Sequence, residues 1–244
     1  MTEFVDLHLC APLMDVEQNR IMIAKSAELG YRLVAVPFPP NVKWKEVERL
    51  QKMSGDVGID LCTRVDLSPK TTGELLGSLR NLRRKFEVVS VLCTSKAVAR
   101  QAAKDRRVDL LSFPIVETRA TFLDSAEAEL ASESLASLEI DMAQFLSLEG
   151  FRRVRLISAL RREVATAKRF GVPVTLSSGA ASVYLLRKPQ DYASLAMLFD
   201  MESSLALRAL SDVPLNMVER NRQKLSPDFV APGIRVVRRR DQSG

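Results

Sequence analysis

Phe4-Val5-Asp6-Leu7-His8-Leu9 opens the chain with polar residues at alternate positions of an apolar run, which is typical of a short β-strand. Similar runs rich in Val, Ile and Leu recur along the chain, and segments with helical periodicity separate them. We predict seven strands and no clear eighth, near residues 3–9, 32–37, 58–64, 87–92, 108–113, 136–140 and 172–177. Because strands separated by helices pair in parallel, the sequence predicts an α/β fold: a TIM-barrel-like barrel of about seven parallel strands ringed by helices.

The predicted elements indicate one domain. With 244 residues, the chain has the size of a single α/β barrel. After residue 190 the pattern turns helical, with segments near 190–199, 202–210 and 214–224. Capping residues place several helix ends: Asp15, Thr71 with Glu74, and Asp124 with Glu127 at starts, and Gly30 and Gly171 at stops. We predict a barrel domain over 1–231 and a basic C-terminal tail over 232–244.

Composition narrows the function classes. Thirty-six Lys and Arg against thirty Asp and Glu give a net charge of +6, which favours phosphate-rich partners. Three widely spaced cysteines support neither a disulfide framework nor a zinc ribbon. No apolar run approaches the roughly 20 residues that a membrane helix needs. We therefore predict a cytoplasmic protein with no membrane contact.

The charges are segregated along the chain. Residues 120–149 contain seven acidic residues and no basic one, whereas residues 151–170 contain seven basic residues and Glu163 alone as an acid. On a helix, Arg155, Arg162 and Arg169 share one face and could follow a phosphate backbone. The alternative is that this helix pairs with the acidic segment before it. Aromatic residues make up 6% of the chain, and we see none interleaved with the basic residues for base stacking.

Polar residues follow the predicted strands, where the functional groups of a barrel gather. They include His8, Asp6, Asp66, Ser177 and Ser178, which we assign to the barrel mouth with structural roles. Asp66 is spaced to pair with Arg64 on the same side of an extended segment. The run Ser177-Ser178-Gly179 leaves anion binding open as an alternative.

His8 is the single histidine of the chain. A hydrolytic metal site of the kind that opens with Asp-x-His-x-His needs further histidines and carboxylates, and the second histidine is missing here. We therefore predict no catalytic residue and no metal in this chain. The alternative is a metal-dependent phosphoesterase that uses His8, Asp6 and Glu139 around a metal ion.

An ordered set of short motifs runs through nearly the whole chain. They are Asp6-Leu7-His8, Arg64-Val65-Asp66-Leu67, Val108-Asp109-Leu110-Leu111-Ser112-Phe113-Pro114, Leu138-Glu139-Ile140, Leu160-Arg161-Arg162-Glu163, Ser177-Ser178-Gly179-Ala180, Asn221-Arg222 and Pro232-Gly233. With these motifs the chain resembles the archaeal ribonuclease P protein component three family, the counterpart of the eukaryotic thirty-kilodalton RNase P subunit.

The resemblance implies a barrel related to the polymerase-and-histidinol-phosphatase barrel and a role in removing 5′ leaders from precursor tRNA. It implies that the catalytic RNA, with its Mg ions, performs the chemistry, and that this chain binds no cofactor of its own. The expected partners are RNase P RNA, RNase P protein component two and the other subunits, with precursor tRNA contacted indirectly. Our candidates for RNA contact are Arg64, Arg83, Arg84, Arg161 and Arg162.

Overall fold

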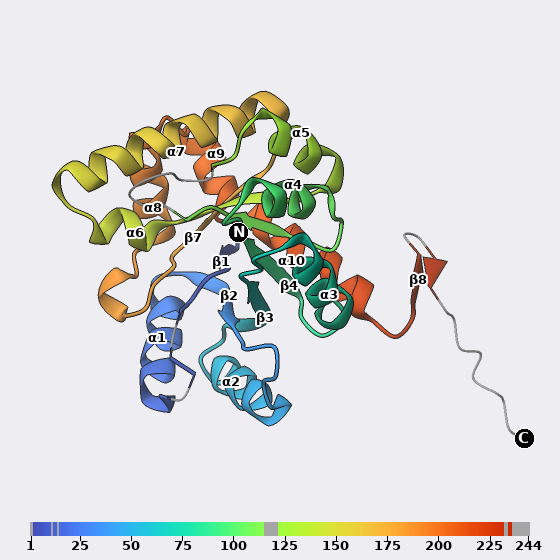
Figure 1. Ribbon diagram of the computed structural model, residues 1–244. Coiled ribbons are helices and arrows are strands. Elements are labelled where there is room, and N and C mark those ends of the chain that lie inside the picture. Colours follow the sequence, from blue (N-terminus) through green and yellow to red (C-terminus); the bar gives the residue numbers. More distant parts are fainter. Residues whose placement is uncertain (1, 11, 14, 115–121, 232–233, 236–244) are drawn as a thin grey trace, which may run out of the picture.

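Seven parallel strands form the centre of the computed structural model, which describes residues 2–10, 12–13, 15–114, 122–231 and 234–235. The strands pair in sequence order and curl into a barrel (Figure 1). They are β1 (Phe4–Asp6), β2 (Tyr31–Pro37), β3 (Asp60–Leu67), β4 (Val88–Leu92), β5 (Leu110–Ser112), β6 (Ser137–Asp141) and β7 (Val174–Ser177). An isolated bridge between Leu9 and Ala180 links the end of β7 to the end of β1. The predicted barrel and all seven predicted strands are confirmed.

Helices surround the barrel, as the alternation in the sequence predicts (Figure 1). They are α1 (Val16–Glu28), α2 (Trp44–Asp56), α3 (Thr72–Leu82), α4 (Lys96–Lys104), α5 (Ser125–Ser134), α6 (Met142–Ser147), α7 (Gly150–Phe170), α8 (Pro189–Ala196), α9 (Ser203–Ala209) and α10 (Asp212–Leu225), with short 3-10 turns η1 (Val183–Leu185) and η2 (Met197–Phe199). None of the helices in the described ranges is long and apolar enough to cross a membrane.

The predicted helix caps are mostly present. The Asp15 carboxylate accepts a hydrogen bond from the N–H of Gln18 (2.9 Å) at the start of α1. A full capping box at the start of α5 joins Asp124 and Glu127. Gly171 ends α7 with φ +70°, a conformation that glycine adopts without the cost a Cβ brings. These caps fix the starts of α1 and α5 and the end of α7, where the chain turns back to the barrel.

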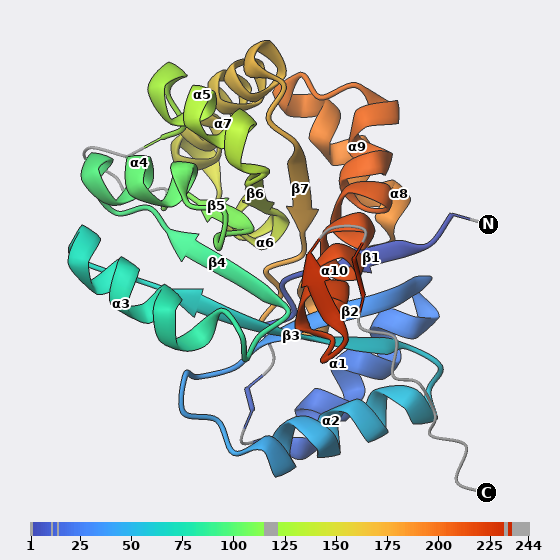
Figure 2. The ribbon, with the colours of Figure 1, turned by 90° about the vertical axis from the view of Figure 1, so that its right-hand side faces the viewer.

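Helix α10 closes the amino-terminal end of the barrel (Figure 2). Met217 and Val218 are buried against inward-facing residues at the start of the strands, among them Val5, Leu33 and Val88. Burial of one such side chain contributes about 1.5–3 kcal/mol. The barrel interior is therefore a packed core at this end, beside the ion pairs that Arg83 and Arg220 make with Asp109. The opposite end, the carboxyl-terminal mouth, holds a separate polar cluster.

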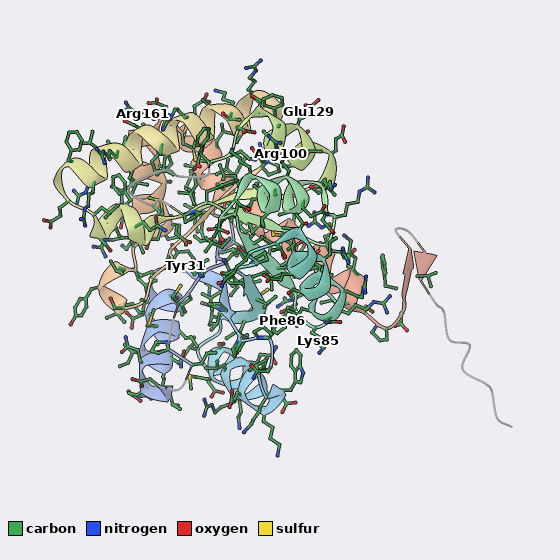
Figure 3. All side chains as sticks on the ribbon, viewed as in Figure 1. Tyr31, Lys85, Phe86, Arg100, Glu129 and Arg161 are labelled. Carbon is green, nitrogen blue, oxygen red and sulfur yellow. The ribbon has the colours of Figure 1, made fainter. Side chains whose placement is uncertain are left out.

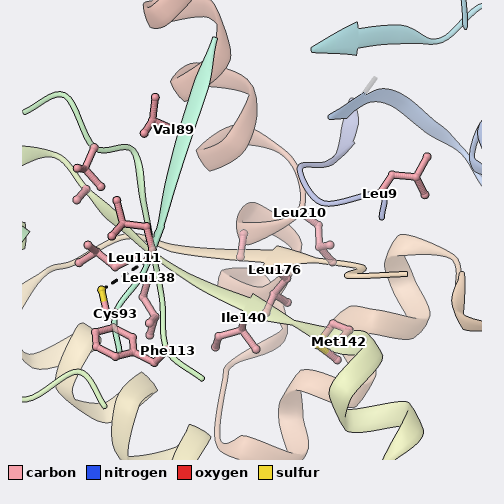
Figure 4. Close-up of a cluster of buried hydrophobic side chains, with 14 of the residues drawn as sticks. Leu9, Val89, Cys93, Leu111, Phe113, Leu138, Ile140, Met142, Leu176 and Leu210 are labelled. Atoms are coloured by element: carbon pink, nitrogen blue, oxygen red, sulfur yellow. Dashed lines mark hydrogen bonds between the residues drawn. The ribbon is translucent and has the colours of Figure 1, made fainter. Parts of the chain in front are cut away.

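The larger hydrophobic core lies between the outer face of the barrel and the helices. Strand alternation separates the two cores: in β2, Val34 joins the outer core, whereas Leu33 joins the inner one. Phe86, labelled in Figure 3, lies 6.1 Å from Trp44 of α2, measured between ring centroids. Figure 4 shows Leu111 and other side chains of this core on neighbouring strands.

Two further strands form a separate hairpin beyond α10. Strand β8 (Phe229–Ala231) pairs antiparallel with β9 (Ile234–Arg235), and neither strand belongs to the barrel sheet. The boundary that we predict between the barrel domain and the tail falls inside this hairpin. The rest of the predicted basic tail, 232–233 and 236–244, lies outside the described residues.

Candidate functional site

Arg64 lies at the centre of the barrel mouth and is 1% exposed. Its Nε donates to Asp66 Oδ1 (2.6 Å), and its two terminal nitrogens donate to the two carboxylate oxygens of Glu139 (2.5 and 2.7 Å). A further bond reaches the carbonyl oxygen of Leu7 (2.7 Å). Burial lowers the pKa of Arg64, but Glu139 and Asp66 outweigh this effect and hold it well above its ordinary value.

The predicted pair of Arg64 with Asp66 is therefore present, but the larger contact is the bidentate pair with Glu139. Strand β6 supplies Glu139, 75 positions further along the chain. Glu139 also accepts hydrogen bonds from the hydroxyls of Ser177 (2.7 Å) and Ser90 (3.2 Å). Ser177 lies in the barrel mouth, and no local pattern in the sequence contains its bond to Glu139.

His8 lies beside this pair, with a carboxylate at each ring nitrogen. Nδ1 is 2.9 Å from Asp141 Oδ1, and Nε2 is 3.2 Å from Asp66 Oδ2. Burial and the charge of Arg64 lower the pKa of His8, but Asp141 and Asp66 outweigh them and raise it well above its ordinary value. A histidine that donates from both nitrogens is the charged imidazolium. His8 thus acts as a second cation in the mouth.

Asp6 and Ser178 join the ends of the first and last barrel strands. Asp6 Oδ1 accepts from the backbone N–H of Ser178 (2.8 Å) and of His8 (3.1 Å), and the Ser178 hydroxyl donates to the His8 carbonyl (3.1 Å). Burial raises the pKa of Asp6. These bonds lie where the isolated bridge links the sheet, and they agree with the structural role that we predict for both residues. Because the bonds to Asp6 and to the His8 carbonyl occupy the Ser178 N–H and hydroxyl, the anion-binding alternative loses two of its donors.

The barrel mouth does not fit a catalytic metal ion. His8, Glu139 and Asp141 offer ligand atoms within 4.8 Å of one another, and Asp6, which the phosphoesterase alternative requires, is not in that set. Both oxygens of Glu139 already bond to Arg64. A metal ligand must be a neutral imidazole, whereas His8 donates from both nitrogens. The phosphoesterase alternative therefore lacks the ligands that it needs.

The structure corrects one of the five arginine candidates. Arg64 is enclosed in the barrel and bonded to Glu139, so it is not available to an RNA phosphate, and its role is structural. Arg83 is 14% exposed and paired with Asp109 (2.8 Å) at the other end of the barrel. Arg84 is exposed. The RNA contacts of these last two residues stay predictions.

Helix α7 carries the other two candidates along the outer side of the barrel, where Figure 3 labels Arg161. Arg161 contacts the C-terminal helical region through the Leu198 carbonyl (3.2 Å) and Asp200 (3.3 Å). Arg162 is exposed and lies on the face that the sequence predicts, with Arg155 and Arg169. We call these three exposed residues the arginine face: Arg155, Arg162 and Arg169.

Each arginine of this face lies over a phenylalanine ring. The guanidinium carbon is 5.1 Å from the Phe151 ring centroid for Arg155, 5.6 Å from Phe122 for Arg162, and 5.4 Å from Phe170 for Arg169. No aromatic residue is interleaved within the basic run itself, but rings beside it contact its arginines in space. Phe151 and Phe170 flank the basic run directly, a signal that the sequence does contain, whereas Phe122 comes from the segment before α5.

The acidic helix α5 has other partners. Lys96 of α4 pairs with Asp124 (2.9 Å) and Glu127 (3.2 Å), and Arg100 of the same helix pairs with Glu127 (3.4 Å). Lys168 of α7 pairs with Glu202 at the start of α9 (2.6 Å). These pairs favour an arginine face directed to solvent over one neutralised by the acidic segment.

Known proteins are similar to this chain in sequence and in fold. A sequence model of the family described as RNase P subunit p30 matches residues 3–226. Ribonuclease P protein component 3 of Methanosarcina mazei is 31% identical over 216 residues, 88% of each chain. A chain in the cryo-EM structure of archaeal ribonuclease P with mature tRNA superposes with a TM-score of 0.82 at 18% identity, over 98% of this chain and 100% of that chain. A putative prolidase from Bifidobacterium longum, with a TM-score of 0.57 at 12% identity over 91% of this chain and 70% of its own, shares the fold alone.

Proposed function

The chain belongs to the RNase P subunit p30 family, and from that premise we propose that it supports the catalytic RNA through its exposed arginines and leaves the cleavage to that RNA. It is a protein subunit of ribonuclease P, the endoribonuclease that removes 5′ leaders from precursor tRNA. The barrel mouth agrees with a supporting role, because its carboxylates and its histidine are bonded to one another and to Arg64.

The arginine face is the observation that carries the RNA contact. Its three guanidinium groups are seven residues apart, which is about 10 Å along a helix axis. Charged side chains at such intervals on one exposed ridge can each neutralise a phosphate and release a counterion. Arg84, which lies between α3 and β4 in the chain, is a separate exposed candidate.

The partners follow from the family resemblance and are part of the proposal. RNase P protein component two is the proposed protein partner, next to the other subunits, and precursor tRNA is contacted through the assembled enzyme. We propose that the catalytic RNA holds the Mg ions, and the bonds of the barrel-mouth carboxylates to Arg64 and His8 agree with this proposal. We place the subunit in the cytoplasm, where free thiols such as those of Cys10, Cys62 and Cys93 persist.

Reconstitution of precursor-tRNA cleavage tests the proposal. The catalytic RNA and the other protein subunits are assembled with and without this chain, and the cleavage rate is measured over a range of Mg concentrations. We expect a lower rate or a higher Mg requirement when the chain is omitted. Equal rates at every Mg concentration would refute a supporting role.

A further inference from the structure

We propose that the guanidinium of Arg64 is a built-in cation that occupies a latent metal site in the barrel mouth. In the natural chain this side chain keeps divalent ions out. Without it, His8, Glu139 and Asp141 form a site for a divalent cation such as Zn²⁺ or Mn²⁺. The inference concerns the barrel mouth alone and does not depend on RNA binding.

The charges of the cluster show why a cation is needed there. Asp66, Glu139 and Asp141 bring three carboxylates to the mouth, and Glu139 and Asp141 have 0% and 14% of their side chains exposed. Three buried or half-buried negative charges would repel one another strongly in a medium of low dielectric constant. Arg64 lies between two of them, at 2.6 Å from Asp66 and 2.5 Å from Glu139.

The guanidinium holds Glu139 in the way that a metal ion would. A planar guanidinium binds both oxygens of a carboxylate at once, so neither oxygen is left to coordinate an ion. Arg64 cannot lose its proton at any ordinary pH, so the ligand stays occupied. This permanent charge distinguishes Arg64 from a lysine, which can lose its proton, and from a bound ion, which can dissociate.

The remaining atoms are close enough to bind a metal once Arg64 is gone. One atom each from His8, Glu139 and Asp141 lie within 4.8 Å of one another, and ligands around a tetrahedral zinc ion lie roughly 3.4 Å apart. Side-chain movements of about 1 Å, with release of one proton from the His8 imidazolium as the metal binds, would therefore complete three ligands. An ion would also restore the positive charge that the substitution removes.

Metal titration of purified full-length proteins tests the inference. The set is the natural chain, Arg64→Ala, Arg64→Ala with Glu139→Gln, and Arg64→Gln, which keeps a polar group and most of the volume. Each protein is stripped with a chelator and titrated with Zn²⁺ or Mn²⁺. Metal content after gel filtration and the thermal unfolding midpoint are measured.

For Arg64→Ala we expect stoichiometric metal binding and an unfolding midpoint that rises when metal is added. We expect neither for the natural chain or the double variant. An ion present at 100 times its Kd shifts the folding equilibrium about a hundredfold. If Arg64→Ala is unfolded without metal, we expect refolding on metal addition, and Arg64→Gln then gives the readout in a folded protein. Stoichiometric metal on the natural chain, or folded Arg64→Ala or Arg64→Gln that takes up none, would overturn the inference.

Discussion

Removal of the arginine face should weaken RNA binding in a salt-dependent way. The change is a triple substitution of Arg155, Arg162 and Arg169 by Ala, all exposed on one side of α7. The plot of log affinity against log salt has a negative slope, and each lost phosphate contact makes it shallower by about 0.7 for single strands and 0.9 for duplexes. The loss of three contacts therefore makes it shallower by about 2 to 2.7. If the two proteins bind equally at 1 M salt, they differ at least roughly a hundredfold at 0.1 M.

Fluorescence anisotropy with RNase P RNA, measured from 0.1 to 1 M salt with the assembled protein subunits, gives this slope. A matched control removes the same charge from helix α2, on the other side of the barrel (Figure 1), by substituting Lys45, Arg49 and Lys52, which are also exposed. We expect the control to keep nearly the natural slope. An unchanged slope for the α7 variant, or an equal drop for both variants, would refute the assignment of RNA to this face.

Three predictions concern stability, and chemical denaturation measures each of them. Arg64→Met should destabilise the fold by about 3–5 kcal/mol, because it leaves Glu139 buried and without its cation, and Glu139→Leu in the same chain should recover most of that loss. Burial raises the pKa of Glu163 to about 7, so stability should fall by about 3 kcal/mol as the pH rises from roughly 4.5 to above 7, and Glu163→Gln should be flat over that range. Gly179→Ala should cost more than Gly58→Ala, since both glycines have positive φ but a Cβ at Gly179 would meet a side chain at 2.9 Å, whereas at Gly58 no atom lies within 4 Å.

The sequence predicts local features well because they depend on neighbours in the chain. Strand alternation, the Asp15 and Gly171 caps and the seven-residue spacing of the arginine face are all confirmed. Arg161 shows the limit: it belongs to the same basic run, but it pairs with Asp200, which directly follows η2 and lies 39 positions further along the sequence. No local pattern contains that contact.

The wrong prediction of an RNA contact for Arg64 has a different cause, because the strand alternation in the sequence already argues against it. Cys62 belongs to the inner core of the barrel, and strand alternation places Arg64 on the same inward side two positions later. The pattern alone could have excluded Arg64 from an RNA surface. What it could not supply is Glu139, since that contact requires β3 and β6 to face each other across a closed barrel.

The charged barrel mouth and the arginine face of α7 have different roles. A buried ion pair contributes little to stability compared with apolar residues of the same size, so the Arg64 and Glu139 pair is not explained by stability. It does fix the mouth: with His8 and Asp141, it ties together segments of β3, β6 and the end of β1. The two positive charges in the barrel mouth, Arg64 and His8, are more than offset by the three carboxylates beside them, so they add no positive charge to the outer field. The surplus of basic residues therefore lies at the surface, and we propose that α7 presents its arginine face there to a phosphate backbone.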